Sequence, residues 1–211
     1  TQNQAFSALL FLYRNVLEQE FGWLNDVIRA KRPRRIPAVL SHNEARALLA
    51  GLDGLPWLLA KLLYGSGLRV MEALRLRVKD LDFERLQITV YEGKGDKDRR
   101  TMLPKTLIEP LRKRTLDVRE WHEQAIHDGY AGVELPHALA KKYPNATLEL
   151  GWQYVFPASR PSRDPRSGTW RRHHLDRSVL SKPIRRAARR LGLNKHVGPH
   201  TLRHCFATHL L

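Results

Sequence analysis

The sequence predicts a mainly helical α+β protein that contains one small antiparallel β-sheet. Apolar residues recur at helical spacing over most of the chain, as in residues 57–64 and 68–76. One stretch differs, because residues 86–90 alternate between apolar and polar side chains. A turn rich in glycine and aspartate follows, and residues 99–103 return as a partner strand. At 211 residues the chain can form one good-sized domain and part of a second.

The first 31 residues form the first predicted helical segment. Their apolar side chains make one wide helical face: Phe6, Leu9, Leu10, Leu12, Tyr13 and Val16. Residues 32–39 combine two prolines with basic side chains, which is typical of a linker between domains. The sequence therefore predicts a helical remnant over 1–31, a linker over 32–39 and the main domain over 40–211.

The main domain opens with a capping box, in which Ser41 caps a helix and Glu44 lies three residues further on. Gly65-Ser66-Gly67 separates the two apolar helices, and glycine permits the sharp turn between them. After the hairpin, Pro104 ends the sheet and residues 105–114 begin another helix.

The second half of the main domain alternates between short helices and extended segments. Residues 117–128 predict a helix, and residues 135–146 predict a shorter one closed by a proline. An aromatic strand is expected over 152–157. Residues 160–190 read as a basic loop with 11 Lys and Arg against 2 Asp, and a last helix begins at Pro199.

The composition indicates a polyanionic partner. The chain has 37 Lys and Arg against 21 Asp and Glu, a formal net charge of +16, and a pI of about 10.5. Nucleic acid is the usual partner for such a charge, and no long apolar segment indicates a membrane. The single cysteine excludes an internal disulfide and suits a reducing cytoplasm. No histidine or cysteine spacing predicts a metal site, so we expect neither metal nor cofactor.

Two helix starts carry paired polar residues beside apolar ones. Arg69 and Glu72 lie three apart on one helix face, and His200 and Arg203 do the same near the other end of the chain. Arginine binds phosphate oxygens with two parallel hydrogen bonds, and helix N-termini favour anions. The two pairs together predict a phosphate site.

With these residues the chain resembles the tyrosine recombinases of the phage integrase family. Their site combines Arg in Gly-Leu-Arg-x-x-Glu/Asp, a Lys in a β-hairpin, and His-x-x-Arg. The matching positions are Gly67-Leu68-Arg69-Val70-Met71-Glu72, Lys94 in the hairpin turn, and His200-Thr201-Leu202-Arg203. The resemblance implies a tyrosine-recombinase catalytic domain over 40–211 and makes residues 1–31 the remnant of a helical core-binding domain.

The resemblance also implies a reaction, namely transesterification through a 3′-phosphotyrosyl intermediate without metal or cofactor. Arg69 and Arg203 would bind the phosphate oxygens, Lys94 would protonate the leaving 5′-oxygen, His200 would assist, and Glu72 would orient Arg69. The family's tyrosine follows the His-x-x-Arg helix, and none of the chain's tyrosines lies in that place. We therefore expect a truncated catalytic domain that binds DNA without cleaving it.

Further segments are similar to one subfamily, the integron integrases. They are residues 62–69, 130–136, 142–146, 152–157, 171–174 and 200–211, with an insertion at about 117–150. The resemblance implies recombination of gene cassettes in the bacterial cytoplasm, at the nucleoid. The recombining unit would be a tetramer on DNA, and its sites would be duplexes and folded single-stranded hairpins with protruding bases. The residues expected to contact DNA are Trp152, Pro165, Arg171, Arg172, His173 and His174.

Two other interpretations stay open at this point. A non-catalytic nucleic-acid-binding protein would use the basic segment 160–190 and would not need the arginine and histidine motifs. A metal nuclease would need clustered carboxylates, for which Asp80, Asp82 and Glu84 are the candidates. An aspartate-rich turn is usually only a turn, and the order of the motifs favours a recombinase.

Overall fold

A computed structural model describes residues 2–19, 38–91, 98–130, 132–135, 139–164 and 167–210. The chain divides into two compact units, Thr1–Ile36 and Pro37–Leu211, and the division lies within the predicted linker. Two residues with a predicted role, Lys94 and Pro165, lie outside the described ranges.

The first unit contains helix α1 (Gln2–Phe11), which continues as a π-helical turn over Leu12–Val16. None of the residues of these two elements is buried. The predicted helix over 1–31 is therefore observed from residue 2 to residue 16, and the assignment of this segment to a core-binding domain stays a prediction.

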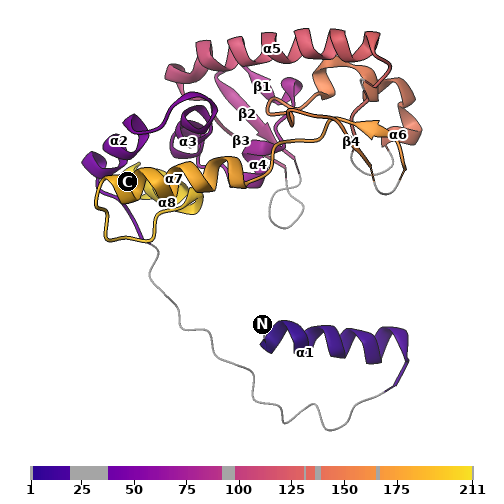
Figure 1. Ribbon diagram of the computed structural model, residues 1–211, viewed down its shortest axis with the longest axis horizontal. Helices are drawn as coiled ribbons and strands as arrows, with labels where there is room; N and C mark the ends of the chain where they lie inside the picture. The colour runs from indigo at the N-terminus through magenta and orange to yellow at the C-terminus, as the bar shows by residue number, and fades with distance from the viewer. Residues whose placement is uncertain are drawn as a thin grey trace. The chain divides into compact units, whose positions relative to one another are not determined.

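The second unit is mainly helical with two small antiparallel sheets, which confirms the predicted fold class (Figure 1). Its helices and strands are α2 (His42–Ala50), α3 (Gly54–Ser66), α4 (Val70–Leu74), β1 (Leu81–Asp82), β2 (Gln87–Val90), β3 (Arg99–Met102), α5 (Ile108–His127), α6 (Leu139–Lys142), β4 (Ser162–Arg163), β5 (Trp170–Arg171), α7 (Ser178–Arg190) and α8 (Pro199–His209). Short 3-10 turns cover Val78–Asp80, Lys105–Leu107, Pro144–Leu148 and Leu150–Trp152. None of the described helices is long and apolar enough to cross a membrane.

The larger sheet has the strand order β1-β2-β3 and is antiparallel throughout. Ile88 pairs with Thr101 and Val90 with Arg99, so the predicted hairpin is confirmed and the two-residue β1 is added at its edge. Ile88 and Val90 are buried while the residues between them are not, because successive side chains of a strand face opposite sides.

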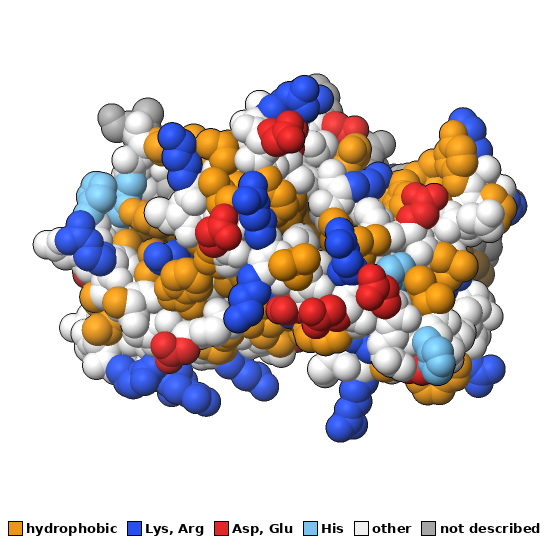
Figure 2. Space-filling model, turned by 90° about the horizontal axis from the view of Figure 1, so that it is seen from above, with side chains coloured by type: hydrophobic (Ala, Val, Ile, Leu, Met, Phe, Trp, Pro, Cys, Tyr) orange, Lys and Arg blue, Asp and Glu red, His pale blue; other side chains and the backbone are white. Residues whose placement is uncertain are grey.

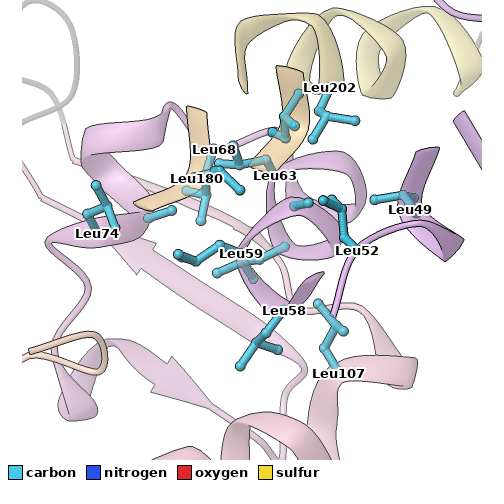
Figure 3. Packing of buried hydrophobic residues seen from close by; sticks show 14 of the residues in the cluster. Leu49, Leu52, Leu58, Leu59, Leu63, Leu68, Leu74, Leu107, Leu180 and Leu202 are labelled. Carbon is cyan, nitrogen blue, oxygen red and sulfur yellow. The ribbon is translucent and has the colours of Figure 1, made fainter. Parts of the chain in front are cut away.

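Helix α3 lies at the centre of the hydrophobic core, and Figure 3 shows leucines of several elements converging on it. α3 packs against α8, α7, α2 and α4. Leu59, Leu62 and Leu63 of α3 are almost fully buried, and Leu180 of α7 and Leu202 of α8 face the same cluster. Each such leucine contributes about 2 kcal/mol of burial free energy, so this packing fixes α8 beside the turn that follows α3.

That turn depends on Gly67, which ends α3 in the left-handed region at φ +64°. A Cβ at Gly67 would also overlap the ring of Phe206 in α8. Glycine therefore satisfies two requirements at once, the backbone conformation and the close approach of α8. The approach brings the residues after Gly67 next to those of α8.

Three sequence predictions were wrong in detail. The helices expected over 105–114 and 117–128 are one helix, α5, because buried Leu111, Val118 and Ala125 continue a single apolar stripe. The expected strand over 152–157 forms only two isolated bridges, since its backbone partners come from two different segments.

The third correction concerns the basic loop over 160–190, whose second half is helix α7. Leu180, Ile184, Ala187 and Ala188 of α7 are buried in the core. The outward side of the helix carries the exposed basic residues Lys182, Arg185, Arg186, Arg189 and Arg190.

Candidate functional site

Arg69 and Glu72 form the predicted pair at the start of α4. Arg69 is the N-cap residue, and its backbone N donates to Glu72 Oε2 at 2.8 Å. The Arg69 guanidinium donates through Nη1 to Glu72 Oε1 at 2.5 Å. Glu72 thus satisfies a free N–H at the helix start and orients Arg69, as an acidic residue at the third helical position commonly does.

A second arginine, Arg99, binds the same carboxylate from the first position of β3. Its Nη1 donates to Glu72 Oε1 at 3.0 Å and its Nη2 to Oε2 at 2.6 Å. This is the parallel two-bond geometry that makes arginine–carboxylate pairs strong. Sequence reasoning missed Arg99, because it lies 27 positions from Glu72 and no local spacing joins them.

Arg203 of α8 completes the cluster. Its Nη1 donates to the backbone oxygen of Gly67 at 2.5 Å and lies 3.8 Å from Glu72 Oε2. The Arg69, Arg99 and Arg203 side chains are each about one third exposed, whereas that of Glu72 is 11% exposed. Three guanidinium groups and one carboxylate leave a net charge of +2, so the cluster is an open anion site.

The carboxylate of Glu72 stays ionised within this cluster. Burial would raise its pKa, but the hydrogen bonds from Arg99 and Arg69 outweigh burial and lower the pKa from 4.5 to about 2. Desolvation by burial lowers the pKa of Arg203. His200 lies in the first turn of α8 with its side chain exposed, on the helix that carries Arg203.

A cavity of about 880 Å³ begins at Arg69 and Glu72 and extends to an aromatic wall. The wall consists of Tyr91, Trp152 and Tyr154 together with the imidazoles of His173 and His174. The His174 ring packs edge-on against Tyr154, with 5.5 Å between centroids. Three residues predicted to contact DNA, Trp152, His173 and His174, therefore line one cavity with Arg69 and Glu72.

Arg77 holds this wall together and was not singled out from the sequence. Its Nη1 donates to the backbone oxygen of Trp152 at 2.7 Å, and its Nη2 donates to the backbone oxygen of Glu134 at 2.9 Å. The guanidinium lies 4.7 Å from the Tyr154 ring centroid. Because Glu134 belongs to the predicted insertion and Trp152 follows it, Arg77 ties the insertion to the turn after α4.

Of the other three predicted DNA contacts, Pro165 lies outside the described residues, and Arg171 and Arg172 do not line this cavity. Arg171 of β5 lies 3.5 Å from the carboxylate of Asp164. Arg172 turns toward α5, where it lies 6.0 Å from the Trp121 ring centroid and lines a different, much smaller cavity.

The carboxylates that a metal nuclease would need have other partners. Asp80 Oδ2 accepts from the Arg77 backbone N, and Asp82 accepts from the backbone of Glu84 and Arg85. Within the described ranges, no three His, Cys, Asp or Glu residues come together as metal ligands would.

Asp80 predicts a pH effect on stability. It is 5% exposed, its Oδ1 has no hydrogen-bond partner among the described residues, and burial raises its pKa from 3.8 to about 6. A raised carboxyl pKa favours the folded state at low pH. The contribution of Asp80 to the free energy of unfolding therefore disappears as the pH rises from about 4 through 6. The wild type should therefore lose about 2–3 kcal/mol of its free energy of unfolding over this pH range, and Asp80→Asn should not show this loss.

Urea unfolding of the wild type and of Asp80→Asn at pH 4.5 and pH 7.5 measures the difference in the free energy of unfolding between the two pH values. Asp53→Asn, at an exposed position, is the control and should keep the wild-type difference. An unchanged difference in Asp80→Asn would contradict the assignment.

Comparison with known proteins shows what the chain is similar to. Residues 38–211 match the model of the phage integrase family. An Escherichia coli protein named integrase/recombinase is 46% identical over 211 residues, which cover all of this chain and 63% of that protein. The crystal structure of XerA recombinase superposes with a TM-score of 0.54 at 26% identity, covering 99% of this chain and 61% of that one.

A further solved structure carries DNA. It is XerH site-specific recombinase bound to difH substrate in a pre-cleavage complex, with a TM-score of 0.53 at 25% identity, covering 96% of this chain and 51% of that one. The chain spans less than two thirds of the length of each of these proteins. Since the family model matches nearly the whole second unit, in which the arginine cluster lies, the chain belongs to the phage integrase family.

Proposed function

We propose that this chain carries the DNA-binding and phosphate-binding core of a site-specific recombinase of the integron integrase type. The whole recombinase acts on gene cassettes in the bacterial cytoplasm, through a 3′-phosphotyrosyl intermediate, in a tetramer on DNA, whereas this chain by itself binds DNA without cleaving it. Its preferred sites include folded single-stranded hairpins with protruding bases. One observation carries the proposal, namely that Arg69 and Glu72 of the arginine cluster line the same cavity as Trp152, His173 and His174.

The roles are those that the resemblance to the tyrosine recombinases implies. Arg69 and Arg203 bind the two non-bridging oxygens of the scissile phosphate, where negative charge increases in the transition state. Glu72 and Arg99 hold Arg69 in place. Lys94, which lies between β2 and β3 in the sequence, supplies the proton to the leaving 5′-oxygen, and His200 assists at the phosphate.

The exposed basic face of α7 supplies backbone contacts for the flanking DNA. The face along which α5 runs is different. Figure 2 shows it with acidic and basic side chains interspersed among hydrophobic ones, so it lacks the uniform positive charge that follows a phosphate backbone. The exposed basic residues of α7 and the arginine cluster are therefore the proposed contacts with DNA.

Binding to two DNAs of equal length tests the proposal. One is a hairpin with two extrahelical bases and the other is its fully paired counterpart, and both are titrated across a salt series. Phosphate contacts weaken steeply with salt on both DNAs, whereas base stacking on an aromatic ring does not. We expect a hairpin preference that persists at high salt and falls about tenfold in Trp152→Ala, since stacking contributes about 1–3 kcal/mol per base.

Trp121→Ala is the matched control, because Trp121 lies on α5 and lines the smaller cavity. It should keep the hairpin preference of the wild type. Equal binding of the two DNAs by the wild type would leave a basic DNA-binding protein without hairpin recognition.

A further inference from the structure

Lys79 occupies the aromatic surface on which a base would stack. Its Nζ lies 3.3 Å from the centroid of the Trp152 ring and 5.1 Å from that of Tyr91. Non-bonded atoms in contact lie about 3.5–4 Å apart, so the ammonium fills the first layer above the Trp152 ring. A base and this ammonium cannot share that face of Trp152.

The Lys79 side chain can also move away from the Trp152 ring. Its ammonium makes no hydrogen bond or ion pair with another described residue, and its side chain is exposed on a flexible four-carbon stem. Arg77, the other cation near Trp152, differs because backbone oxygens of Trp152 and Glu134 hold it. Of the two cations, Lys79 is the one that can move without leaving protein acceptors unpaired.

We propose that Lys79 is a specificity-determining residue that exchanges places with an extrahelical base. In free protein its ammonium covers Trp152. When a base stacks on that ring, the ammonium moves to a phosphate of the same nucleotide strand, where Coulomb attraction replaces the cation–π contact. A DNA without an extrahelical base leaves Lys79 on the ring and gains no such phosphate contact.

This inference rests on the proposed function, because it names the residue that links base stacking to phosphate binding at the same wall. Three features of the cavity support it. The Trp152 ring already binds two cations, Lys79 and Arg77. Desolvation lowers the pKa of Lys79, which is consistent with an ammonium that is partly removed from water. The cavity also has room for a base beside the wall.

Salt dependence of binding tests the exchange. The DNAs are the hairpin with two extrahelical bases and the same hairpin with abasic residues at those two positions. Each phosphate contact by a lysine adds about 0.7–0.9 to the slope of log affinity against log salt. We expect the wild-type slope to be steeper by about this amount on the base-containing hairpin, and the difference to vanish in Lys79→Met.

Lys113→Met, at an exposed position on α5, is the matched control and should keep the slope difference. A second measurement uses lysine labelled with ¹³C, with Lys79→Met identifying the resonance. In free protein the Lys79 methylene protons should show an upfield ring-current shift. Base-containing hairpin should relieve that shift, and abasic hairpin should not.

The outcomes separate the inference from the proposed function. In one outcome, Trp152→Ala removes the hairpin preference, but the wild-type salt slopes on the two hairpins are equal and the ring-current shift of Lys79 persists in the complex. The exchange is then wrong, and hairpin recognition by Trp152 stands. If the wild type binds base-containing and abasic hairpins alike and Trp152→Ala changes nothing, base recognition at this wall is wrong, and the exchange with it.

Discussion

Replacing Glu72 by alanine is expected to lower the free energy of unfolding by about 2–3 kcal/mol. Glu72 is the shared acceptor of Arg69 and Arg99 and lies 3.8 Å from Arg203. Without it, three partly buried guanidinium groups repel one another and lose their acceptor, which is the costly way to break a buried ion pair. Urea unfolding at pH 7 measures the loss.

Glu109→Ala is the matched control, because Glu109 pairs with Arg112 at the same helical spacing but is 81% exposed. Exposed pairs of this kind contribute at most about 0.5 kcal/mol. Phosphate, compared with chloride at equal ionic strength, should restore more stability to Glu72→Ala than to the wild type, because the anion can replace the carboxylate. A loss no larger than that of the control would contradict the role of Glu72.

The pH dependence of the free energy of unfolding gives a second prediction for Glu72. Its pKa is lowered from 4.5 to about 2 in the folded protein, so its contribution is present above pH 4.5 and is lost as the pH falls from 4.5 toward 2. Glu72→Ala should lack this acid-dependent loss. Asp80 has the opposite sign, since burial raises its pKa and its contribution disappears as the pH rises.

Replacing Arg77 by methionine is expected to remove the hairpin preference and to lower the free energy of unfolding by about 2 kcal/mol. Methionine keeps an unbranched stem but leaves the backbone oxygens of Trp152 and Glu134 without their donor. The aromatic wall then loses its link to the turn after α4. The binding assay with hairpin and paired DNA, together with urea unfolding, measures both effects.

The arginine cluster should be unaffected, because the Arg77 guanidinium bonds to Trp152, Glu134 and Tyr154, and no hydrogen bond joins it to Glu72 in the described part of the chain. Affinity for the paired DNA should therefore fall little. Arg85→Met is the control, since Arg85 is 75% exposed and its ion pair is with Asp82 of its own turn. A hairpin preference that persists in Arg77→Met would show that the wall does not depend on Arg77.

Several local features followed directly from the sequence. The capping box of Ser41 and Glu44, the pairing of Arg69 with Glu72, and the helix beginning at Pro199 all depend on residues three or four apart. Such contacts are fixed by the helix itself, whatever packs around it. The boundaries of α5 and α7 were less accurate, because apolar stripes continue across polar positions that the sequence pattern treats as breaks.

The tertiary structure alone decided how distant residues meet. Arg99 reaches Glu72 from another strand, Arg77 joins the insertion to the turn after α4, and Lys79 covers Trp152. Arg172, which the sequence grouped with His173, turns to α5 instead. These contacts depend on how α3 packs against α8 and on how the insertion folds back, and no spacing along the chain encodes them. The sequence by itself therefore determined the fold class, the positive charge and the pairing of Arg69 with Glu72, and the packing of the core determined which side chains share one cavity.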